Sequence, residues 1–510
     1  MQSLKIWEDK IKDKRRNTDF RDFLKSVSSW FQIMFYKNDG LISRFPESQK
    51  IKNIVEVNTY NQKYGDGVNG IEYDFSQNFF ENFKKVFVNI PKMATIKYGN
   101  NENCDYTDTT FGASNSYLSI CIGEKAENIL YSALAYINVK NVLNSVHITL
   151  NSENIYFCFQ VSRSFNIFYS KNIANSSNIW FSSNLIGCSE CIFCDDLENQ
   201  KYCIENKVYE KEEYFKLKKE ILKQKEKFIN FYKKYPKISK NLSSENCIGQ
   251  GVSFSENIEN GYIIERISNG RNVSFSDGNP LSSNIYDCFD ITHLDEGYGW
   301  MGCGQGSDNM YIGANASSSS HIYYSYFMGN CSFCLGCIGL KNKSFCILNK
   351  EYSKEEWYEL ANKIFASMEK DGILGDFFPG ELNPFYFNDT MAYLIDDSFT
   401  KEEVGKEGFM WRDEKIKVDI PEGAEIVYST PPARSSLPPQ SRGTKGGVLS
   451  DYQGFDENGN WKINPEILKK VIIDNDGNYY KIVPMEYDFL MKYGLPLPEI
   501  HWLERIKMGF

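Results

Sequence analysis

The sequence has few of the side chains from which most catalytic and metal centres are built. Only four histidines occur among 510 residues (His147, His293, His321 and His501), and no two of them share a metal-ligand spacing. No stretch approaches the roughly 20 consecutive apolar residues of a membrane span, so we expect no membrane association. The formal net charge is -10, which disfavours nucleic acid as a partner for the whole chain.

Two further features of the sequence bear on the cellular compartment. The first twenty residues mix charges and lack the apolar core of a secretory leader, so we expect a cytoplasmic protein. All fourteen cysteines lie between Cys104 and Cys346. In the cytoplasm we expect them as thiols or metal ligands rather than disulfides, and their even number leaves a disulfide framework open.

A cysteine block occurs twice. The copies are Cys188-x-x-Cys191-x-x-Cys194-x8-Cys203 and, 143 positions later, Cys331-x-x-Cys334-x-x-Cys337-x8-Cys346. The match continues through Ile204-x-Asn206-Lys207 and Ile347-x-Asn349-Lys350 to Glu213 and Glu356. Two parts of the chain are therefore predicted to share one plan.

Short repeats precede each block. Ile155, Ile167, Ile179 and Cys191 recur at a step of 12 residues, as do Val161, Ile173, Leu185 and Leu197, and the step from Asn128 to Asn141 is 13. Further columns are Met310, Ile322 and Cys334, then Gly313, Ser325 and Cys337, then Val273 and Ile285, and then Ser276 and Cys288. Such columns are typical of a β-solenoid, whose coils stack at strand spacing. Because a 12-residue coil would have a narrow interior, we expect two repeats in each coil of about 24 residues.

An amphipathic helix is expected after each solenoid. Alternating three- and four-residue steps connect Tyr214, Leu217, Ile221, Phe228, Phe231 and Tyr235, with the polar Gln224 in the same seam, and they predict a helix that stops at Pro236. After the second block, Ser353-x-x-Glu356 is a capping box that precedes an apolar stripe of Trp357, Leu360, Ile364 and Met368. Such helices would cover the solenoid ends and hide open strand edges.

These patterns predict a mainly β fold with two β-solenoid (β-helix-like) segments of 12-residue repeats, each followed by an amphipathic helix. The segments are an N-terminal region (1–72), a first solenoid (73–208), an amphipathic helix (209–241), a second solenoid (242–350), a covering helix (351–372) and an irregular α+β C-terminal region rich in Pro and Gly (373–510). In the last region we expect an exposed linker at 429–448, turns at 456–459 and 474–477, and a helix start at Thr400.

Several motifs carry a family resemblance. Besides the two blocks they are Tyr73-Asp-Phe-Ser-Gln-Asn-Phe-Phe80, Ile90-Pro-Lys-Met-Ala94, Asp376-Phe-Phe-Pro379 and Tyr493-Gly-Leu-Pro-Leu-Pro498. On these motifs residues 72–510 resemble an uncharacterised cysteine-rich repeat family of bacteria of the candidate phyla radiation. The resemblance implies a solenoid and no known activity. Members of that family often carry further CxxC pairs near both ends, suggestive of zinc ribbons, which this chain lacks.

The eight block cysteines can be interpreted as zinc ligands, as disulfides or as packed thiols. They are Cys188, Cys191, Cys194, Cys203, Cys331, Cys334, Cys337 and Cys346. CxxC spacing suits structural zinc. However, Cys191 continues a column of isoleucines and Cys194 a column of Ser and Cys, and cysteine packs well as a small hydrophobe. We therefore expect packed thiols and no cofactor, with less than about one zinc per chain, and zinc remains the alternative.

Other candidate sites also have simpler interpretations. Residues 209–240 carry eleven Lys against five Glu, which we interpret as a solvated helix face rather than a nucleic-acid surface. Tyr156, Phe168 and Trp180 form an aromatic stripe that could hold sugars or a protein, but we expect it to be buried under another element. His293, near Asp295 and Glu296, is interpreted as part of a loop.

We therefore expect a non-enzymatic repeat scaffold that offers flat faces for protein–protein contact or self-assembly. One alternative is a β-helix enzyme or binding protein acting on polysaccharide, although no acidic cluster recurs at the 12-residue step. The other is a metal-binding protein that uses the CxxCxxC blocks.

Overall fold

The structure is a computed structural model of the chain. It describes all residues except 1, 29–31, 39, 47, 49–50, 52, 65–66, 225–243, 248, 254–256, 258–260, 268–276, 286–293, 304–305, 414–419, 421, 430–446, 458 and 509–510. Among the described residues, no helix is long and apolar enough to cross a membrane.

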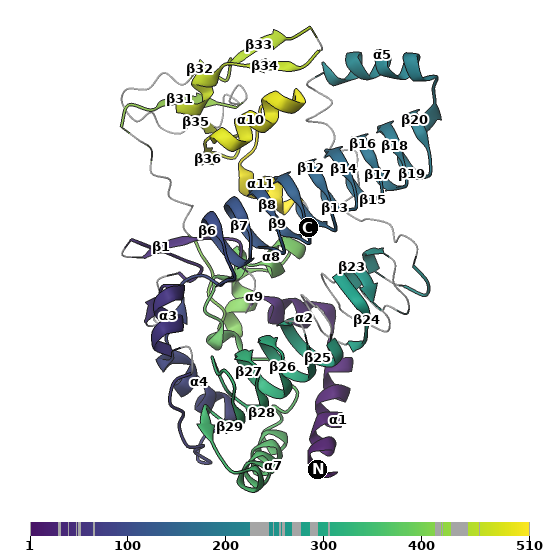
Figure 1. The fold of residues 1–510 in the computed structure, drawn as a ribbon. Coiled ribbons are helices and arrows are strands. Elements are labelled where there is room, and N and C mark those ends of the chain that lie inside the picture. Colours follow the sequence, from purple (N-terminus) through teal and green to yellow (C-terminus); the bar gives the residue numbers. More distant parts are fainter. Residues whose placement is uncertain are drawn as a thin grey trace. The chain divides into compact units, whose positions relative to one another are not determined.

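The chain forms two compact units, each assembled from two separate segments. Tyr98–Ser239 and Asp413–Phe510 make up one, here called the Cys188 unit, and Met1–Lys97 and Lys240–Arg412 make up the other, the Cys331 unit. Each contains a β-solenoid that ends in one copy of the cysteine block and is followed by a helix (Figure 1). The predicted mainly β fold with two solenoid segments is confirmed.

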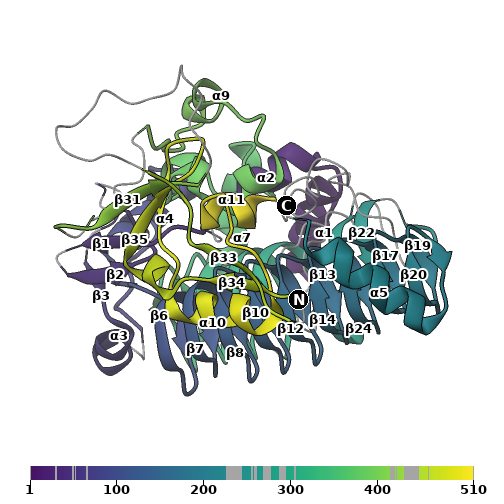
Figure 2. The ribbon, with the colours of Figure 1, turned by 90° about the horizontal axis from the view of Figure 1, so that it is seen from above.

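Two parallel stacks of short strands build the solenoid of the Cys188 unit. After β5 (Lys97–Tyr98), its strands are β6 (Glu102–Phe111), β7 (Ser114–Gly123), β8 (Glu127–Leu130), β9 (Ala133–Tyr136), β10 (Lys140–Leu143), β11 (Val146–Thr149), β12 (Glu153–Tyr156), β13 (Phe159–Ser162), β14 (Phe165–Phe168), β15 (Lys171–Ala174), β16 (Ser177–Trp180), β17 (Ser183–Ile186), β18 (Ser189–Ile192), β19 (Asp195–Glu198), β20 (Lys201–Ile204) and β21 (Lys207–Val208). From β8 to β20, even-numbered strands pair with even-numbered strands and odd with odd, and β21 then pairs antiparallel with β20; Figure 2 shows the row of coils from above. Ile155 pairs with Ile167 and Ile179 with Cys191, so the predicted columns are confirmed.

The expected coil of two repeats is wrong, because a single repeat closes a whole coil. Each strand pairs in parallel with the equivalent strand of the next repeat, as β10 does with β12 and β12 with β14. Every third residue, as at Asn154, Phe157, Gln160 and Arg163, has a positive φ. These left-handed positions bend the chain four times per coil. Asparagine tolerates that conformation better than most residues, which explains its abundance there.

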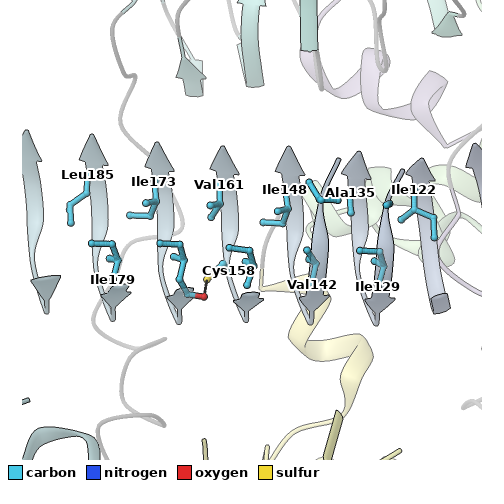
Figure 3. Close-up of a cluster of buried hydrophobic side chains, with 14 of the residues drawn as sticks. Ile122, Ile129, Ala135, Val142, Ile148, Cys158, Val161, Ile173, Ile179 and Leu185 are labelled. Atoms are coloured by element: carbon cyan, nitrogen blue, oxygen red, sulfur yellow. Dashed lines mark hydrogen bonds between the residues drawn. The ribbon is translucent and has the colours of Figure 1, made fainter. Parts of the chain in front are cut away.

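The narrow interior is filled by alternating large and small side chains. In one coil Ile155, Cys158, Val161 and Ser164 face inward, and all are buried. Figure 3 shows the large residues of the two stacks as facing rows, with Ile148, Val161 and Ile173 opposite Val142 and Ile179. Two bulky residues per coil fit because the other two are small. The column of isoleucines taken alone suggests a wider coil.

Buried serine hydroxyls join successive coils. The Ser164 hydroxyl donates to the carbonyl of Ser162 at 2.7 Å and accepts the N–H of Ser176 at 3.0 Å. Ser170 and Ser182 repeat this arrangement on the opposite column. These polar groups therefore lie in an apolar interior without losing hydrogen bonds.

The C-terminal segment of the Cys188 unit covers one face of its solenoid. It contains β31 (Glu425–Tyr428), β32 (Gly447–Val448), β33 (Tyr452–Phe455), β34 (Trp461–Ile463), η3 (Pro465–Lys469), β35 (Lys470–Ile473), β36 (Tyr479–Tyr480), α10 (Pro484–Tyr493) and α11 (Trp502–Lys507). On α10, Phe489 stacks on Tyr156 and Tyr493 lies against Phe168. Arg505 on α11 donates to Glu486 on α10 at 2.6 Å, and both side chains are fully buried.

In the Cys331 unit, helices surround a solenoid of the same kind. Before the solenoid come α1 (Gln2–Arg16), α2 (Phe20–Val27), β1 (Tyr36–Asn38), β2 (Leu41–Ser43), β3 (Ile54–Val55), α3 (Val57–Tyr64), α4 (Phe79–Asn89) and β4 (Lys92–Met93). The solenoid strands are β22 (Gly249–Ser253), β23 (Gly261–Ile267), β24 (Asp277–Ile285), β25 (Leu294–Cys303), β26 (Ser307–Ser317), β27 (Ser320–Gly329), β28 (Ser332–Leu335), β29 (Ser344–Ile347) and β30 (Lys350–Glu351). After it come α7 (Lys354–Lys370), η1 (Gly380–Leu382), η2 (Phe387–Asp389), α8 (Met391–Ile395) and α9 (Lys401–Lys406). The predicted columns continue here, because Met310 pairs with Ile322 and Ile322 with Cys334.

Two motifs of the family resemblance meet in the core of the Cys331 unit. Phe80 of the first motif lies 6.0 Å, ring to ring, from Phe378 of the Asp376–Pro379 motif, and Phe83, further along α4, lies 4.7 Å from the same ring. Phe378 also packs on Tyr326 of β27, and Phe79 of the first motif lies edge-on to Tyr324. These motifs therefore build an aromatic core.

Helices follow both solenoids as predicted. On α7 the Ser353–Glu356 capping box is present, and the buried Trp357 indole donates to the carbonyl of Cys346 at 3.1 Å. The other helix, α5 (Lys211–Leu222), buries Tyr214 against Tyr202 of β20. Leu217 and Ile221 are half-buried. The rest of this predicted helix, with Phe228 and Phe231, lies outside the described residues.

Smaller features of the C-terminal region also match the sequence. Asp456 and Asp474 each form a turn in which the side chain and the carbonyl accept backbone N–H groups from the following residues. Thr400 caps α9 by accepting the N–H of Glu403. Most of the linker expected at 429–448, and the column residues Val273, Ser276 and Cys288, lie outside the described residues.

Candidate functional site

The cysteine blocks form the last coil of each solenoid. In the Cys188 unit, Cys188 follows Ser176 in its column, Cys191 follows Ile179, and Cys194 follows Ser182. Cys203 lies directly opposite Cys191 in the next strand of the stack. All four are buried and unbridged. The Cys331 block has the same arrangement, with Cys334 opposite Cys346.

Each thiol donates to a backbone carbonyl two residues earlier. Cys188 contacts the carbonyl of Ile186 at 3.4 Å, and Cys194 that of Ile192 at 3.4 Å. Cys331 likewise contacts Gly329 at 3.3 Å. Serine hydroxyls make the same contact in earlier coils, so a thiol can replace a hydroxyl here without disturbing the backbone.

The middle cysteine of each block is the hub of its cluster. Hydrogen bonding to Cys191 lowers the pKa of Cys188 to about 7 and also lowers that of Cys194, whereas the pKa of Cys191 itself is raised. Cys334 has the same effect on Cys331, whose pKa falls to about 7, and on Cys346. By contrast, burial raises the pKa of Cys158, which lies in mid-solenoid away from the blocks. The block thiols therefore interact with each other.

Within the described ranges, no three His, Cys, Asp or Glu side chains already stand in a ligand arrangement around a metal. Any ion bound by a block would therefore require its thiols to turn toward it. Packed thiols, zinc ligation and disulfide formation remain distinct predictions at these eight positions.

An asparagine closes the open end of each cysteine coil. Asn349, in the turn after β29, accepts the N–H of Ile338 at 2.7 Å and donates to the carbonyl of Ile338 at 2.8 Å. Asn206 makes the same pair of bonds to Asp195 at 2.9 and 2.7 Å. The side-chain amide thus imitates the next strand, which protects the edge from further pairing. The repeated block is therefore a module that terminates a solenoid.

One face of the Cys188 solenoid is open to solvent. Its central column contains Glu127, Lys140, Glu153, Phe165, Ser177 and Ser189, at successive positions of the even-numbered strands. Lys140 pairs with Glu127 at 3.2 Å, and Phe165 is 51% exposed. We call this column, with the asparagine columns on its two edges, the ladder face.

Asparagine amides fix the edges of the ladder face. Along one edge Asn128, Asn141, Asn154, Asn166 and Asn178 are joined head to tail by hydrogen bonds of 2.8 to 3.0 Å. On the other edge Asn138 donates to Asn151 at 2.6 Å. Each bond holds a side chain in one orientation. The face therefore presents an ordered surface repeated at coil spacing.

The other predicted site features are covered, paired or undescribed. The stripe of Tyr156, Phe168 and Trp180 is buried, as expected, and α10 packs on its first two members. In the described part of the basic region, Lys218 pairs with Glu190 at 2.8 Å and Lys223 with Glu220 at 3.0 Å. His293 and the side chains of Asp295 and Glu296 lie outside the described residues.

The ladder face was missed in the sequence analysis. Its signal, a charged column beside an asparagine column at the 12-residue step, is visible in the sequence, but only the 12-residue coil places the two columns side by side. Searches of protein-family models, curated proteins and solved structures found no match to this chain.

Proposed function

We propose that this protein is a repeat scaffold whose ladder face makes contacts with a second copy of the chain. The observation that supports this best is the exposed column of Lys140, Glu153 and Phe165, framed by ordered asparagine ladders. A pre-ordered surface loses little side-chain entropy on binding.

The charges on the ladder face of one copy are complementary to those on the same face of a second copy. Lys140 and Glu153 occupy neighbouring coils. If a second copy lies antiparallel across a two-fold axis between these coils, each Lys140 meets the Glu153 of the other copy. Contacts of this kind are isologous, the commonest type in homodimers.

The size of the ladder face determines how strongly two copies are expected to bind each other. Six coils at about 4.8 Å span about 29 Å, and the face is only a few side chains wide. The area is therefore at the low end for specific interfaces, which favours a weak and reversible contact.

Sedimentation velocity over a range of protein concentrations tests this proposal. We expect the full chain to self-associate reversibly and Phe165→Glu to abolish the association, because in this arrangement Phe165 lies opposite Glu127 of the other copy and a glutamate there would bring two like charges together. Lys462→Glu is a control, since it changes charge at an exposed position in the same unit. A chain that stays monomeric at all concentrations, or Phe165→Glu and Lys462→Glu behaving alike, would refute the proposal.

A further inference from the structure

The composition of the interior changes abruptly at the last coil of each solenoid. From Val142 to Leu185, large aliphatic residues alternate with Ser or Cys158 along the inward positions. In the terminal coil, three of four inward residues are cysteines, and the fourth is Leu197. Ser176 and Ser182 are followed by Cys188 and Cys194, although serine already makes the same backbone contacts.

The inward-facing column of large residues changes as well. Ile179 is followed by Cys191 and then by Cys203, and in the other unit Ile322 is followed by Cys334 and then by Cys346. Each step from isoleucine to cysteine removes apolar volume from a buried site. Truncating large core side chains usually destabilises a protein, because the cavity is only partly refilled. Packing alone therefore favours isoleucine at these positions.

The same four positions are cysteine in both units, and in each unit the middle cysteine of the block lies opposite the last one in the neighbouring strand. A single disulfide would use two of the four. Four thiolates around one small ion use all of them, and their tetrahedral arrangement, with Zn–S distances near 2.3 Å, is the usual structural zinc site.

The surroundings suit bound thiolates. The N–H of Asn349 donates to the sulfur of Cys337 at 3.4 Å. Hydrogen-bond donors near a sulfur stabilise the deprotonated form that a metal requires.

We propose that each terminal coil binds one structural Zn²⁺ ion, through Cys188, Cys191, Cys194 and Cys203 in one unit and Cys331, Cys334, Cys337 and Cys346 in the other. On binding, the thiols release their protons and turn toward the coil axis. The ion occupies volume that isoleucine fills in earlier coils, and it ties the last half coil to the coil before it. This proposal is independent of the ladder face.

Elemental analysis of the full chain, purified under reducing conditions without chelator, tests the proposal. We expect about two zinc ions per chain, the number of four-cysteine clusters. Cys191→Ser and Cys334→Ser should each lose one ion, and Cys158→Ser, which alters a buried thiol outside the blocks, should lose none.

Because a hub variant could also unfold its coil, Cys203→Ser provides a second test in the last half coil. In this variant, Co²⁺ titrated into the metal-free protein should give half the sulfur-to-cobalt charge-transfer absorption of the wild type. Less than one zinc per chain after reconstitution, an equal loss in Cys158→Ser, or an intact mass that shows disulfides in the blocks would each overturn the proposal.

Discussion

Replacing the two terminating asparagines should have unequal effects, although they occupy equivalent positions in the repeated block. Asn349 is 8% exposed, and its partner Ile338 is buried. Without the side-chain amide, both backbone groups of Ile338 lose their partners in a site that water cannot easily reach. Leaving a buried donor and acceptor unpaired costs about 1–3 kcal/mol each, so we expect Asn349→Gly to lose about 2–6 kcal/mol.

Asn206 makes the same two bonds, but its side chain and its partner Asp195 are exposed. Water can replace the amide there, so Asn206→Gly should change stability by less than about 0.5 kcal/mol. Both asparagines have positive φ values, 67° and 62°. The alanine variants should therefore each lose about 1 kcal/mol more than the glycine variants, from the left-handed backbone alone.

Hydrogen exchange measured by mass spectrometry is the appropriate assay, because the two units need not unfold together. Peptides covering 338–352 and 195–208 report the opening of each terminal coil. Equal effects of Asn349→Gly and Asn206→Gly would refute the argument that burial determines the cost. Equal effects of glycine and alanine at one position would refute the backbone contribution.

Three further predictions concern the Cys188 unit. Arg505→Met should destabilise this unit by about 3–5 kcal/mol, because it leaves Glu486 without its buried partner. Adding Glu486→Gln should restore much of that loss. Denaturant unfolding of the single and double variants measures both free-energy changes. Asn166→Ala should lower the free energy of unfolding by about 2–3 kcal/mol and Asn166→Gly by about 1 kcal/mol. Both variants break the amide ladder, but only alanine strains the left-handed backbone. Equal losses of stability in thermal unfolding would contradict this. Burial and, to a lesser degree, Arg505 lower the pKa of His501 to about 4. The folded state then binds fewer protons than the unfolded state between pH 6.5 and 4, so up to about 3 kcal/mol of stability is present above pH 6.5 and is lost as the pH falls toward 4. His501→Asn should flatten that part of the stability–pH profile.

The sequence by itself determined the features that depend on neighbouring coils. Ile155 and Ile167 meet because they stand one repeat apart, and that separation can be read directly from the chain. The same holds for the parallel register, the cap at Ser353, the turns at Asp456 and Asp474, and the duplication of the cysteine block. Periodic side chains encode these features locally, so no knowledge of distant contacts is needed.

Only the tertiary structure decided the coil size, the pairing of segments and the surroundings of the candidate sites. The choice between one repeat and two repeats per coil depends on backbone bends at every third residue, which many residue types occupy, as Phe157 and Gln160 do. The packing of residues 413–510 on the solenoid of residues 98–208 rests on contacts such as Phe489 with Tyr156, which leave no period in the sequence. The hub position of Cys191 likewise appears only once the coil closes, because side chains three residues apart converge inside a four-cornered coil and would not do so along an extended strand.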